Sequence, residues 1–388
     1  MKLARCVVVG ICLVLFAGIG RTDQADSTAK SKAASELGDG GPAIKASLSY
    51  PCGVVVDSKG DIYVADTNAN RVRKVDAKTG IITTIAGNSD RSSIGQDGVQ
   101  ATTCSLTHPY GLALDQAGNL LVAESGHGRI RKIDLKTGII TTLAGGGDLR
   151  LQLGQELPAT KAYIGTSSAV AVDPKGDIII SDRNGYIRKM DVKAGTIKTI
   201  AGLGPRGYCG DGGSAIEAKL AEPIGVATDT KGNIYIADSG NLVIRKVEIA
   251  TGIITTAVGK NKPDGSYPEA GPANEYQLTE PTGIAFDSKG NLHIACMWTH
   301  RICRFDAQTD IVTTVAGDGF RDGGGDGRFY GDGGPATAAS LFNPIGIAFD
   351  SADNLYIADQ TNHRIRRVDA KTGIITTIAG NGTPISAN

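Results

Sequence analysis

A sequence unit that recurs six times predicts an all-β fold for this chain, a six-bladed β-propeller. The clearest copies read RVRKVDAKTGIITTIAG from residue 71, RIRKIDLKTGIITTLAG from residue 129 and RIRRVDAKTGIITTIAG from residue 364; weaker copies start at 186, 243 and 301. Their closing glycines lie 57 or 58 residues apart, and 63 apart before the last copy. Each unit holds four short segments rich in Val, Ile, Tyr and Thr, with no helical period. Four short strands in a repeat of about this length are typical of a propeller blade.

The first unit shows how the strands and turns are laid out. Its four expected strands are residues 53–57, 61–66, 71–76 and 81–87. SKG and AKTG separate them as hairpin loops, because glycine adopts positive φ at little cost. A blade is apolar on both faces, so only a closed ring of blades removes those faces from water. The first and last units each hold four strands, so we expect no strand exchange where the ring closes.

The chain divides into four segments by composition. Residues 1–20 join Lys2 and Arg5 to an apolar run and then small residues, which is typical of a signal peptide. The run is shorter than the ~20 residues of a spanning helix, although an uncleaved anchor is the alternative. Residues 21–37 are expected to be a flexible linker, 38–380 the propeller and 381–388 a tail. The six expected blades are residues 38–87, 95–145, 154–202, 210–259, 265–317 and 331–380.

The balanced charge and the predicted signal peptide together indicate the location of the protein. Lys and Arg number 40, and Asp and Glu also number 40, so no basic field is available for nucleic acid. We therefore expect a secreted monomer, extracellular or periplasmic, with no membrane span after signal cleavage.

The repeat resembles a known family. The segment PIGIAFDSADNLYIADQTNHRIRRVD, residues 344–369, is similar to the NHL repeat. With its GDGGPA and GIITTIAG flanks it resembles the NHL-type propellers of large secreted bacterial proteins and of teneurins. The resemblance covers residues 38–380 and implies a six-bladed propeller. It leaves function open, because this architecture hosts adhesion modules, sensors, lyases and lactonases.

Five units carry an acid at the end of the second strand and an arginine within the third. The pairs are Asp66 with Arg73, Glu124 with Arg131, Asp182 with Arg188, Asp238 with Arg245, and Asp359 with Arg366. The fifth unit has Cys296 and Cys303 at these two positions, so both partners change together and should touch. We expect five structural ion pairs. In an exported protein the two cysteines are predicted to form a disulfide.

Two other motifs are given structural interpretations. The GDGG sequences at 38–41, 210–213 and 331–334 lack the ligand spacing of a calcium loop, so we expect turns between blades. His127, His300 and His363 fall in loops and show no zinc spacing, so we expect them to be solvated.

One position varies from unit to unit within the otherwise faithful repeat. It lies three residues before the glycine of the first strand, at the expected mouth of the central channel. Around the ring it is Tyr50, His108, Thr166, Glu222, Glu280 and Asn343. All of these except Thr166 directly precede a proline, and we expect the proline to hold the preceding residue extended. Such variation suggests a ligand-binding ring, although a plain solvated rim is the alternative.

Two functions are compatible with these features. The first is a binding or scaffold module that holds a protein, peptide or glycan at the channel mouth and needs no cofactor. The second resembles the gluconolactonase-type propellers, a calcium-dependent lactonase, esterase or lyase. There Glu222, Glu280 and Asn343 would supply oxygen ligands and His108 the acid or base.

Overall fold

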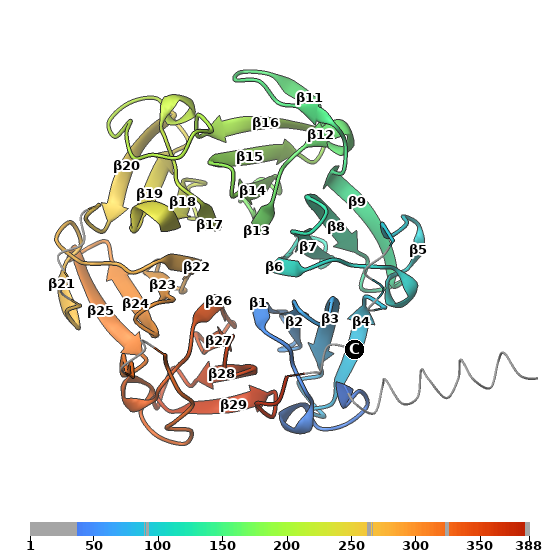
Figure 1. The fold of residues 1–388 in the computed structure, drawn as a ribbon, viewed down its shortest axis with the longest axis vertical. Helices are drawn as coiled ribbons and strands as arrows, with labels where there is room; N and C mark the ends of the chain where they lie inside the picture. The colour runs from blue at the N-terminus through green and yellow to red at the C-terminus, as the bar shows by residue number, and fades with distance from the viewer. Residues whose placement is uncertain are drawn as a thin grey trace, which may run out of the picture.

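The computed structural model describes residues 37–88, 90, 93–261, 265, 267–322 and 326–384. The predicted signal peptide, most of the predicted linker and the end of the tail lie outside these residues. The described chain forms six antiparallel blades arranged as a ring about a central axis (Figure 1). The predicted all-β six-bladed propeller is confirmed, and no strand is exchanged at closure, since β1–β4 and β26–β29 each form one contiguous sheet.

Each blade has its strands in sequence order, from the axis outward. The innermost strands are β1 (Pro51–Val56), β6 (Pro109–Leu114), β13 (Ser167–Val172), β17 (Pro223–Thr228), β22 (Pro281–Phe286) and β26 (Pro344–Phe349). The second strands are β2 (Ile62–Asp66), β7 (Leu120–Glu124), β14 (Ile178–Asp182), β18 (Ile234–Asp238), β23 (Leu292–Cys296) and β27 (Leu355–Asp359).

The two outer strands of each blade complete the sheet. The third strands are β3 (Arg71–Val75), β8 (Arg129–Ile133), β15 (Tyr186–Asp191), β19 (Val243–Glu248), β24 (Arg301–Asp306) and β28 (Arg364–Val368). The fourth strands are β4 (Ile82–Ala86), β9 (Ile139–Gly145), β16 (Thr196–Ala201), β20 (Ile253–Val258), β25 (Ile311–Ala316) and β29 (Ile375–Ala379).

Short elements join the blades. Strands β5 (Val99–Gln100), β11 (Glu156–Pro158) and β21 (Ala270–Pro272) each add a fifth strand to the outer edge of a blade, and β10 (Leu149–Arg150) pairs with β12 (Ala162–Tyr163). Six 3-10 turns complete the set: η1 (Ala43–Lys45), η2 (Ala101–Thr103), η3 (Ala159–Lys161), η4 (Ala215–Glu217), η5 (Ser239–Asn241) and η6 (Ala336–Ala338). These segments cover outer strand edges that would otherwise be open to pairing with another chain.

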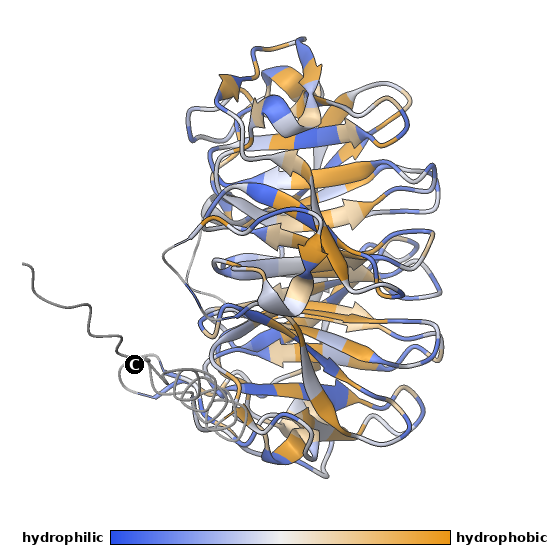
Figure 2. Cartoon of the chain, turned by 90° about the vertical axis from the view of Figure 1, so that its right-hand side faces the viewer, coloured by the Kyte–Doolittle hydropathy of each residue, from blue (hydrophilic) through white to orange (hydrophobic). Residues whose placement is uncertain are grey.

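The hydrophobic core lies between neighbouring blades. Every residue of the six second strands is buried, because these strands are covered on both faces. One core cluster joins Val54 and Val64 of the first blade to Ala358 and Ile365 of the sixth, so blade packing closes the ring. Figure 2 shows the apolar residues concentrated in the strands.

Ring closure also uses backbone hydrogen bonds, beyond the blade packing expected from the sequence. The N–H of Gly380 donates to Ala43 O at 3.0 Å, as Gly87 N–H donates to Ala101 O at 2.9 Å between the first two blades. The same glycine-to-alanine bond joins five of the six pairs of neighbouring blades. The packed region reaches back to Leu37, which is buried, and the Leu37 carbonyl accepts a hydrogen bond from Arg73 at 3.2 Å.

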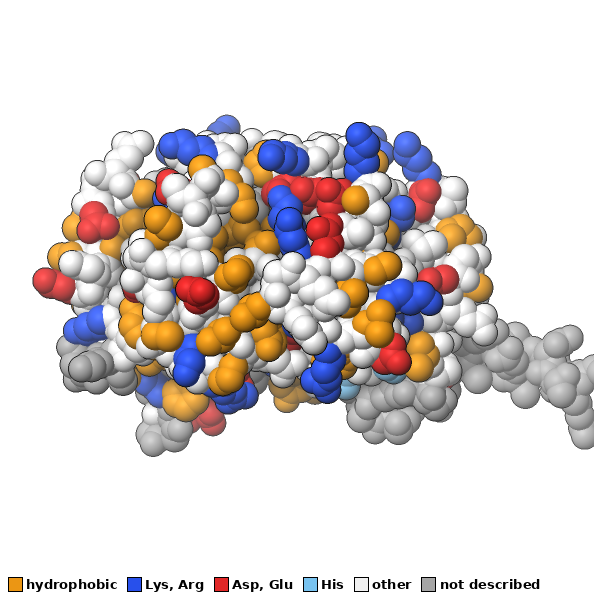
Figure 3. Space-filling view, turned by 90° about the horizontal axis from the view of Figure 1, so that it is seen from above, with side chains coloured by type: hydrophobic (Ala, Val, Ile, Leu, Met, Phe, Trp, Pro, Cys, Tyr) orange, Lys and Arg blue, Asp and Glu red, His pale blue; other side chains and the backbone are white. Residues whose placement is uncertain are grey.

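The ring has two distinct faces. We call the entry face the one where innermost strands begin and where second strands pass to third strands; the turn face carries the tight hairpins of the DSKG and DAKTG type. On the side of the ring drawn in Figure 3, acidic and basic side chains are interspersed. No helix within the described residues is both long and apolar enough to cross a membrane.

Candidate ligand-binding site at the channel mouth

Buried arginines anchor the blades that support the mouth. The structure places the predicted acid–arginine pairs at N–O distances of 3.3 Å (Arg73–Asp66), 3.4 Å (Arg131–Glu124), 3.1 Å (Arg188–Asp182), 3.5 Å (Arg245–Asp238) and 3.5 Å (Arg366–Asp359). Burial raises the pKa of Asp66, Asp238 and Asp359 to about 6, although the arginine beside each lowers it. Desolvation therefore outweighs the charge pairing at these three carboxyls.

A second carboxylate completes four of these sites, and sequence reasoning missed it. It comes from the GDGG motif or, in the second blade, from the related sequence GQDG at residues 95–98, and it lies closer to the arginine than the predicted partner does. The distances are 2.7 Å (Asp39–Arg73), 3.0 Å (Asp97–Arg131), 2.6 Å (Asp211–Arg245) and 2.7 Å (Asp332–Arg366). The available signal was that the motif occurs only in units that also keep the arginine. The motif is thus the second half of an ion-pair site as well as a turn.

The same acids hold the chain just before the mouth. The free carboxylate oxygen of Asp66 accepts from Ser49 N–H at 2.6 Å, and that of Asp359 accepts from Phe342 N–H at 2.7 Å. Each acceptor thus fixes the residue immediately before a mouth position. The repeated ion pairs are a frame that sets the height and direction of the mouth residues.

The mouth residues do not adopt the extended conformation that the following proline led us to expect. Five have left-handed backbones, with φ of 51° at Tyr50, 48° at His108, 48° at Glu222, 42° at Glu280 and 52° at Asn343. At three of these positions the prediction failed because the neighbouring blade binds the backbone N–H group. His108 N–H donates to the Asn70 side chain at 2.9 Å, and Asn343 N–H donates to His300 Nδ1 at 3.2 Å. These bonds offset the cost of the left-handed conformation.

Two of the loop histidines are buried and accept hydrogen bonds from a neighbouring blade, whereas the sequence led us to expect solvated side chains. His300 and His363 are 2% and 7% exposed, and each accepts a mouth N–H through Nδ1. A third, His127, lies 3.0 Å from Glu124 Oε1. Their position before the third strand matches that of Asn70, whose amide oxygen plays the same role in the first blade.

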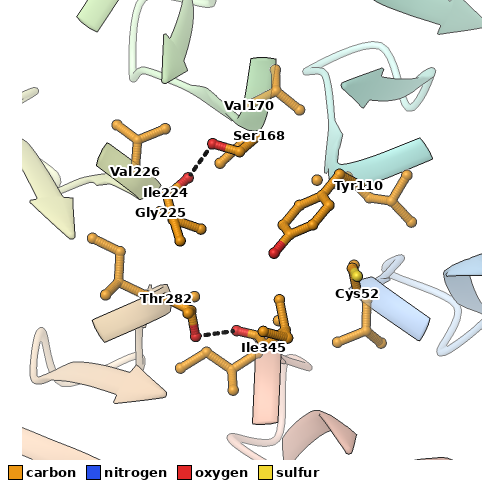
Figure 4. A pocket seen from close by; sticks show the side chains of 18 residues that line it. Cys52, Tyr110, Ser168, Val170, Ile224, Gly225, Val226, Thr282 and Ile345 are labelled. Atoms are coloured by element: carbon orange, nitrogen blue, oxygen red, sulfur yellow. Dashed lines mark hydrogen bonds between the residues drawn. The ribbon is translucent and has the colours of Figure 1, made fainter. Parts of the chain in front are cut away.

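The central channel below the mouth is narrow. A cavity of about 100 Å³ is lined by the innermost strands of all six blades. In Figure 4 the Tyr110 hydroxyl points into its centre, Cys52 faces it, and the Ser168 and Thr282 hydroxyls bond to Ile224 O and Ile345 O. Burial raises the pKa of the Cys52 thiol to about 11, so it is protonated at neutral pH. A channel this small does not admit a ligand of ordinary size, so such a ligand would have to bind at the mouth.

A second variable ring surrounds the mouth, and sequence reasoning did not identify it. It is the residue after each second strand: Thr67, Ser125, Arg183, Ser239, Met297 and Gln360. Gln360 donates to Cys52 Sγ at 3.1 Å, and the Arg183 guanidinium lies 5.7 Å from the Tyr110 ring centroid. Arg183 Nε is buried and makes no hydrogen bond within the described chain.

Of the predicted mouth residues, the two glutamates are brought within range of each other. Burial raises the pKa of Glu280, a hydrogen bond from Trp298 lowers it, and the Glu222 charge raises it further. Glu222 itself is paired with Arg206. The cation beside Glu222 is therefore part of the same chain.

The other predicted mouth residues either make separate contacts or are exposed to solvent. Asn343 Nδ2 donates to the Thr361 hydroxyl at 3.2 Å, Tyr50 packs edge-on against His363, and His108 and Thr166 are exposed. Among the described residues no three His, Cys, Asp or Glu side chains gather as a metal site.

The fifth blade replaces the ion pair with two thiols. Cys296 and Cys303 are each 1% exposed, and their sulfurs lie 3.7 Å apart as free thiols. A disulfide needs about 2.05 Å, so the predicted bond is not formed in this structure. The Tyr276 hydroxyl lies 3.4 Å from Cys303 Sγ, where four of the other blades place the second aspartate beside the arginine.

Known proteins resemble this chain in sequence. The teneurin NHL domain family matches residues 24–96, 204–271 and 304–388. Human NHL repeat-containing protein 2 is 26% identical over 85% of this chain and 48% of its own length. Mouse teneurin-3 is 29% identical over 63% of this chain and 9% of its own, and the Arabidopsis thaliana protein SUPPRESSOR OF QUENCHING 1, chloroplastic, is 28% identical over 64% and 24%. The chain therefore spans less than half of each relative's length.

Solved structures share the fold at lower identity. A Bacteroides thetaiotaomicron protein of unknown function has a TM-score of 0.63 at 16% identity, covering 83% of this chain and 70% of its own. An auxiliary nutrient binding protein from Bacteroides ovatus has a TM-score of 0.58 at 15% identity, covering 85% and 70%. These likenesses establish the propeller architecture only. The family match spans more than half of the chain, and the chain belongs to the teneurin NHL domain family.

Proposed function

We propose that this protein is a secreted binding module that holds a protein, peptide or glycan partner on its entry face. The observation that carries the proposal is a contrast at the mouth. The acids and arginines that position the mouth repeat in five of the six blades, whereas the mouth side chains differ in every blade except the two that carry glutamate. A constant frame with variable contacts is the arrangement expected of a recognition surface.

Two buried polar atoms at the mouth that lack hydrogen-bond partners in the described chain support the same proposal. Arg183 Nε and Glu280 Oε2 are both buried, and neither makes a hydrogen bond within the described chain. Buried polar groups without a partner are costly and uncommon. A ligand that donates to one and accepts from the other would satisfy both. Tyr110 closes the channel beneath them, so that a ligand rests on the mouth and does not enter the ring.

The hydrolase or lyase alternative has no comparable support. The auxiliary nutrient binding and gluconolactonase-like propellers share only the fold with this chain, at 15% and 13% identity. The burial-raised pKa of Cys52 also leaves the channel thiol a poor nucleophile.

The test is ligand capture on peptide and glycan libraries with two matched variants. Arg183→Gln alters the mouth, and Lys78→Gln alters an exposed turn-face position of the first blade. We expect bound ligands to be lost, by about tenfold or more in affinity, only in Arg183→Gln. Ligands that are sensitive to Lys78→Gln and indifferent to Arg183→Gln would contradict the proposal, as would the absence of any retained ligand.

A further inference from the structure

A cleft lies on the entry face beside the mouth, between the fourth and fifth blades. Its volume is about 320 Å³, within the usual range of ligand sites and three times that of the channel. The walls come from the fourth-blade turn at Gly240, the fifth-blade entry at Glu280 and the fifth-blade loop at Trp298. Two segments that join blades add Tyr267 and Arg321.

The fifth blade differs from the others at the centre of this cleft. Trp298 occupies a loop position that is Asn68, Gly126, Gly240 or Thr361 in the blades with the same loop length. It is the single tryptophan of the chain and is 57% exposed, and Tyr267 across the cleft is 43% exposed. Two large aromatic side chains are thus open to solvent around one cavity, where both can contact a ligand.

A carboxylate that forms no ion pair within the described chain lines the same cleft. Trp298 and Glu280 both line this cleft, and Glu280 Oε2 is buried and accepts no hydrogen bond within the described chain. None of the ion pairs in that part of the chain includes Glu280, whereas Glu222 nearby is paired with Arg206. The positive charge of Arg183 also acts on Glu280, but within the described chain no cation lies in ion-pair contact with this carboxylate.

We propose that this cleft binds the cationic side chain of a lysine or arginine on a partner polypeptide. A cation that enters beside Glu280 gains an ion pair and also lies against the Trp298 and Tyr267 rings, whose faces attract positive charge. The alkyl part of either side chain packs on the same rings. The inference rests on the proposed binding function and assigns part of the entry face to one kind of contact.

Arg321 at the cleft distinguishes this ligand from two others. A zwitterion or an anion would use the Arg321 guanidinium, so Arg321→Gln would weaken its binding. A cationic ligand is repelled by Arg321, so Arg321→Gln should leave its binding unchanged or strengthen it. A sugar would stack on Trp298 without needing the Glu280 charge.

The experiment follows the fluorescence of Trp298 during titration with small probes. We expect Nα-acetyl-lysine methylamide and Nα-acetyl-arginine methylamide to give saturable changes with dissociation constants of roughly millimolar size, as ligands this small allow. The neutral Nα-acetyl-norleucine methylamide should give none. Glu280→Gln should weaken the cationic probes about tenfold or more, and Glu275→Gln, an exposed carboxylate outside the cleft, should change binding less than about twofold.

Several results would overturn the inference. They are equal responses to lysine and norleucine probes, saturation by methyl glucoside without saturation by either cation, loss of cation binding in Arg321→Gln, or full binding by a folded Glu280→Gln protein. A circular-dichroism melt of each variant checks folding. The small probes test the cleft alone. If they fail to bind, the cleft proposal is wrong, but the proposed binding function of the entry face still stands or falls on the library experiment.

Discussion

The backbone N–H of Tyr50 donates a hydrogen bond of 3.3 Å to Nδ1 of His363, across the seam where the last blade meets the first. The two rings also contact edge-to-face, with centroids 4.6 Å apart. Residues 313 positions apart are joined here in the way that Asn70 joins the first blade to His108. The acceptor must be an unprotonated Nδ1, so the seam depends on a neutral imidazole.

Replacing this histidine should weaken the closure of the ring. His363→Ala removes the acceptor and the ring contact and places alanine at a φ of 53°, and we expect a loss of about 1–2 kcal/mol in the free energy of unfolding. His363→Asn keeps an acceptor and tolerates this backbone, as Asn70 does at φ 54°, and should lose less than about 0.5 kcal/mol. Urea unfolding at pH 7.5 compares the two. Equal stability of both variants would contradict the role of the bond.

The same histidine should make the seam sensitive to acid. Burial lowers the pKa of His363, and the neighbouring Arg364 lowers it further. The unfolded chain then binds the proton more readily, so this contribution is complete above a pH of about 6.5 and is lost as the pH falls through that value. Unfolding of wild type and His363→Asn between pH 5 and 8 should show the two curves converging in acid.

Other groups affect the same pH range and must be subtracted. Asp66, Asp238 and Asp359 have pKa values raised to about 6, so their contribution falls as the pH rises from about 4 to 6. These residues are identical in wild type and His363→Asn, so the difference between the curves isolates the histidine. A constant difference across the range would contradict the titration.

The two carboxylates on Arg366 should differ in their cost of removal. Asp359 is fully buried and also accepts from Phe342 N–H, and Asp359→Ala should cost about 3–5 kcal/mol because it strands buried partners. The side chain of Asp332 is 33% exposed although it lies nearer, at 2.7 Å, and Asp332→Ala should cost about 1 kcal/mol. Urea unfolding measures both, and the reverse order would show that distance matters more than burial.

The innermost glycine of the sixth blade should resist substitution. A Cβ at Gly346 would lie 2.2 Å from Cys52 O in the first blade, and both atoms belong to rigid backbone regions. Gly346→Ala should therefore cost about 1–3 kcal/mol or more. Gly271→Ala is the control, because the nearest atom to its Cβ would be 3.9 Å away. Thermal unfolding that ranks Gly271→Ala as the less stable variant would contradict this packing of the inner strands.

The paired thiols of the fifth blade remain a predicted disulfide. Their sulfurs are 3.7 Å apart, so a small movement would allow oxidation if the protein is exported as the sequence predicts. Alkylation under denaturing conditions without reductant, followed by peptide mapping, should recover Cys296 linked to Cys303. Exposed Cys209 should be alkylated in the same sample and serves as the internal control. Alkylation of both Cys296 and Cys303 would refute the disulfide.

The six blades, their strand order and the acid–arginine pairs followed from the sequence because they repeat. A repeat places the same residue at the same point of every blade, so Asp359 and Arg366 could be matched from five similar copies. The same comparison did not reveal the GDGG aspartates as partners of the arginines. Asp332 and Arg366 are 34 residues apart, and only the path of the chain over the outer strand brings them to 2.7 Å.

The mouth depended on tertiary contacts between different blades. Proline at position 344 favours an extended Asn343, but His300 of the neighbouring blade captures its N–H and holds it left-handed. The repeat is broken at Tyr110 in the channel, at Arg183 beside it and at Trp298 in the cleft. Periodicity in the sequence therefore could not predict the roles of these three residues. The sequence determined the ring because blade folding is local and repeated; the structure alone decided the site, because its residues meet only when the ring closes.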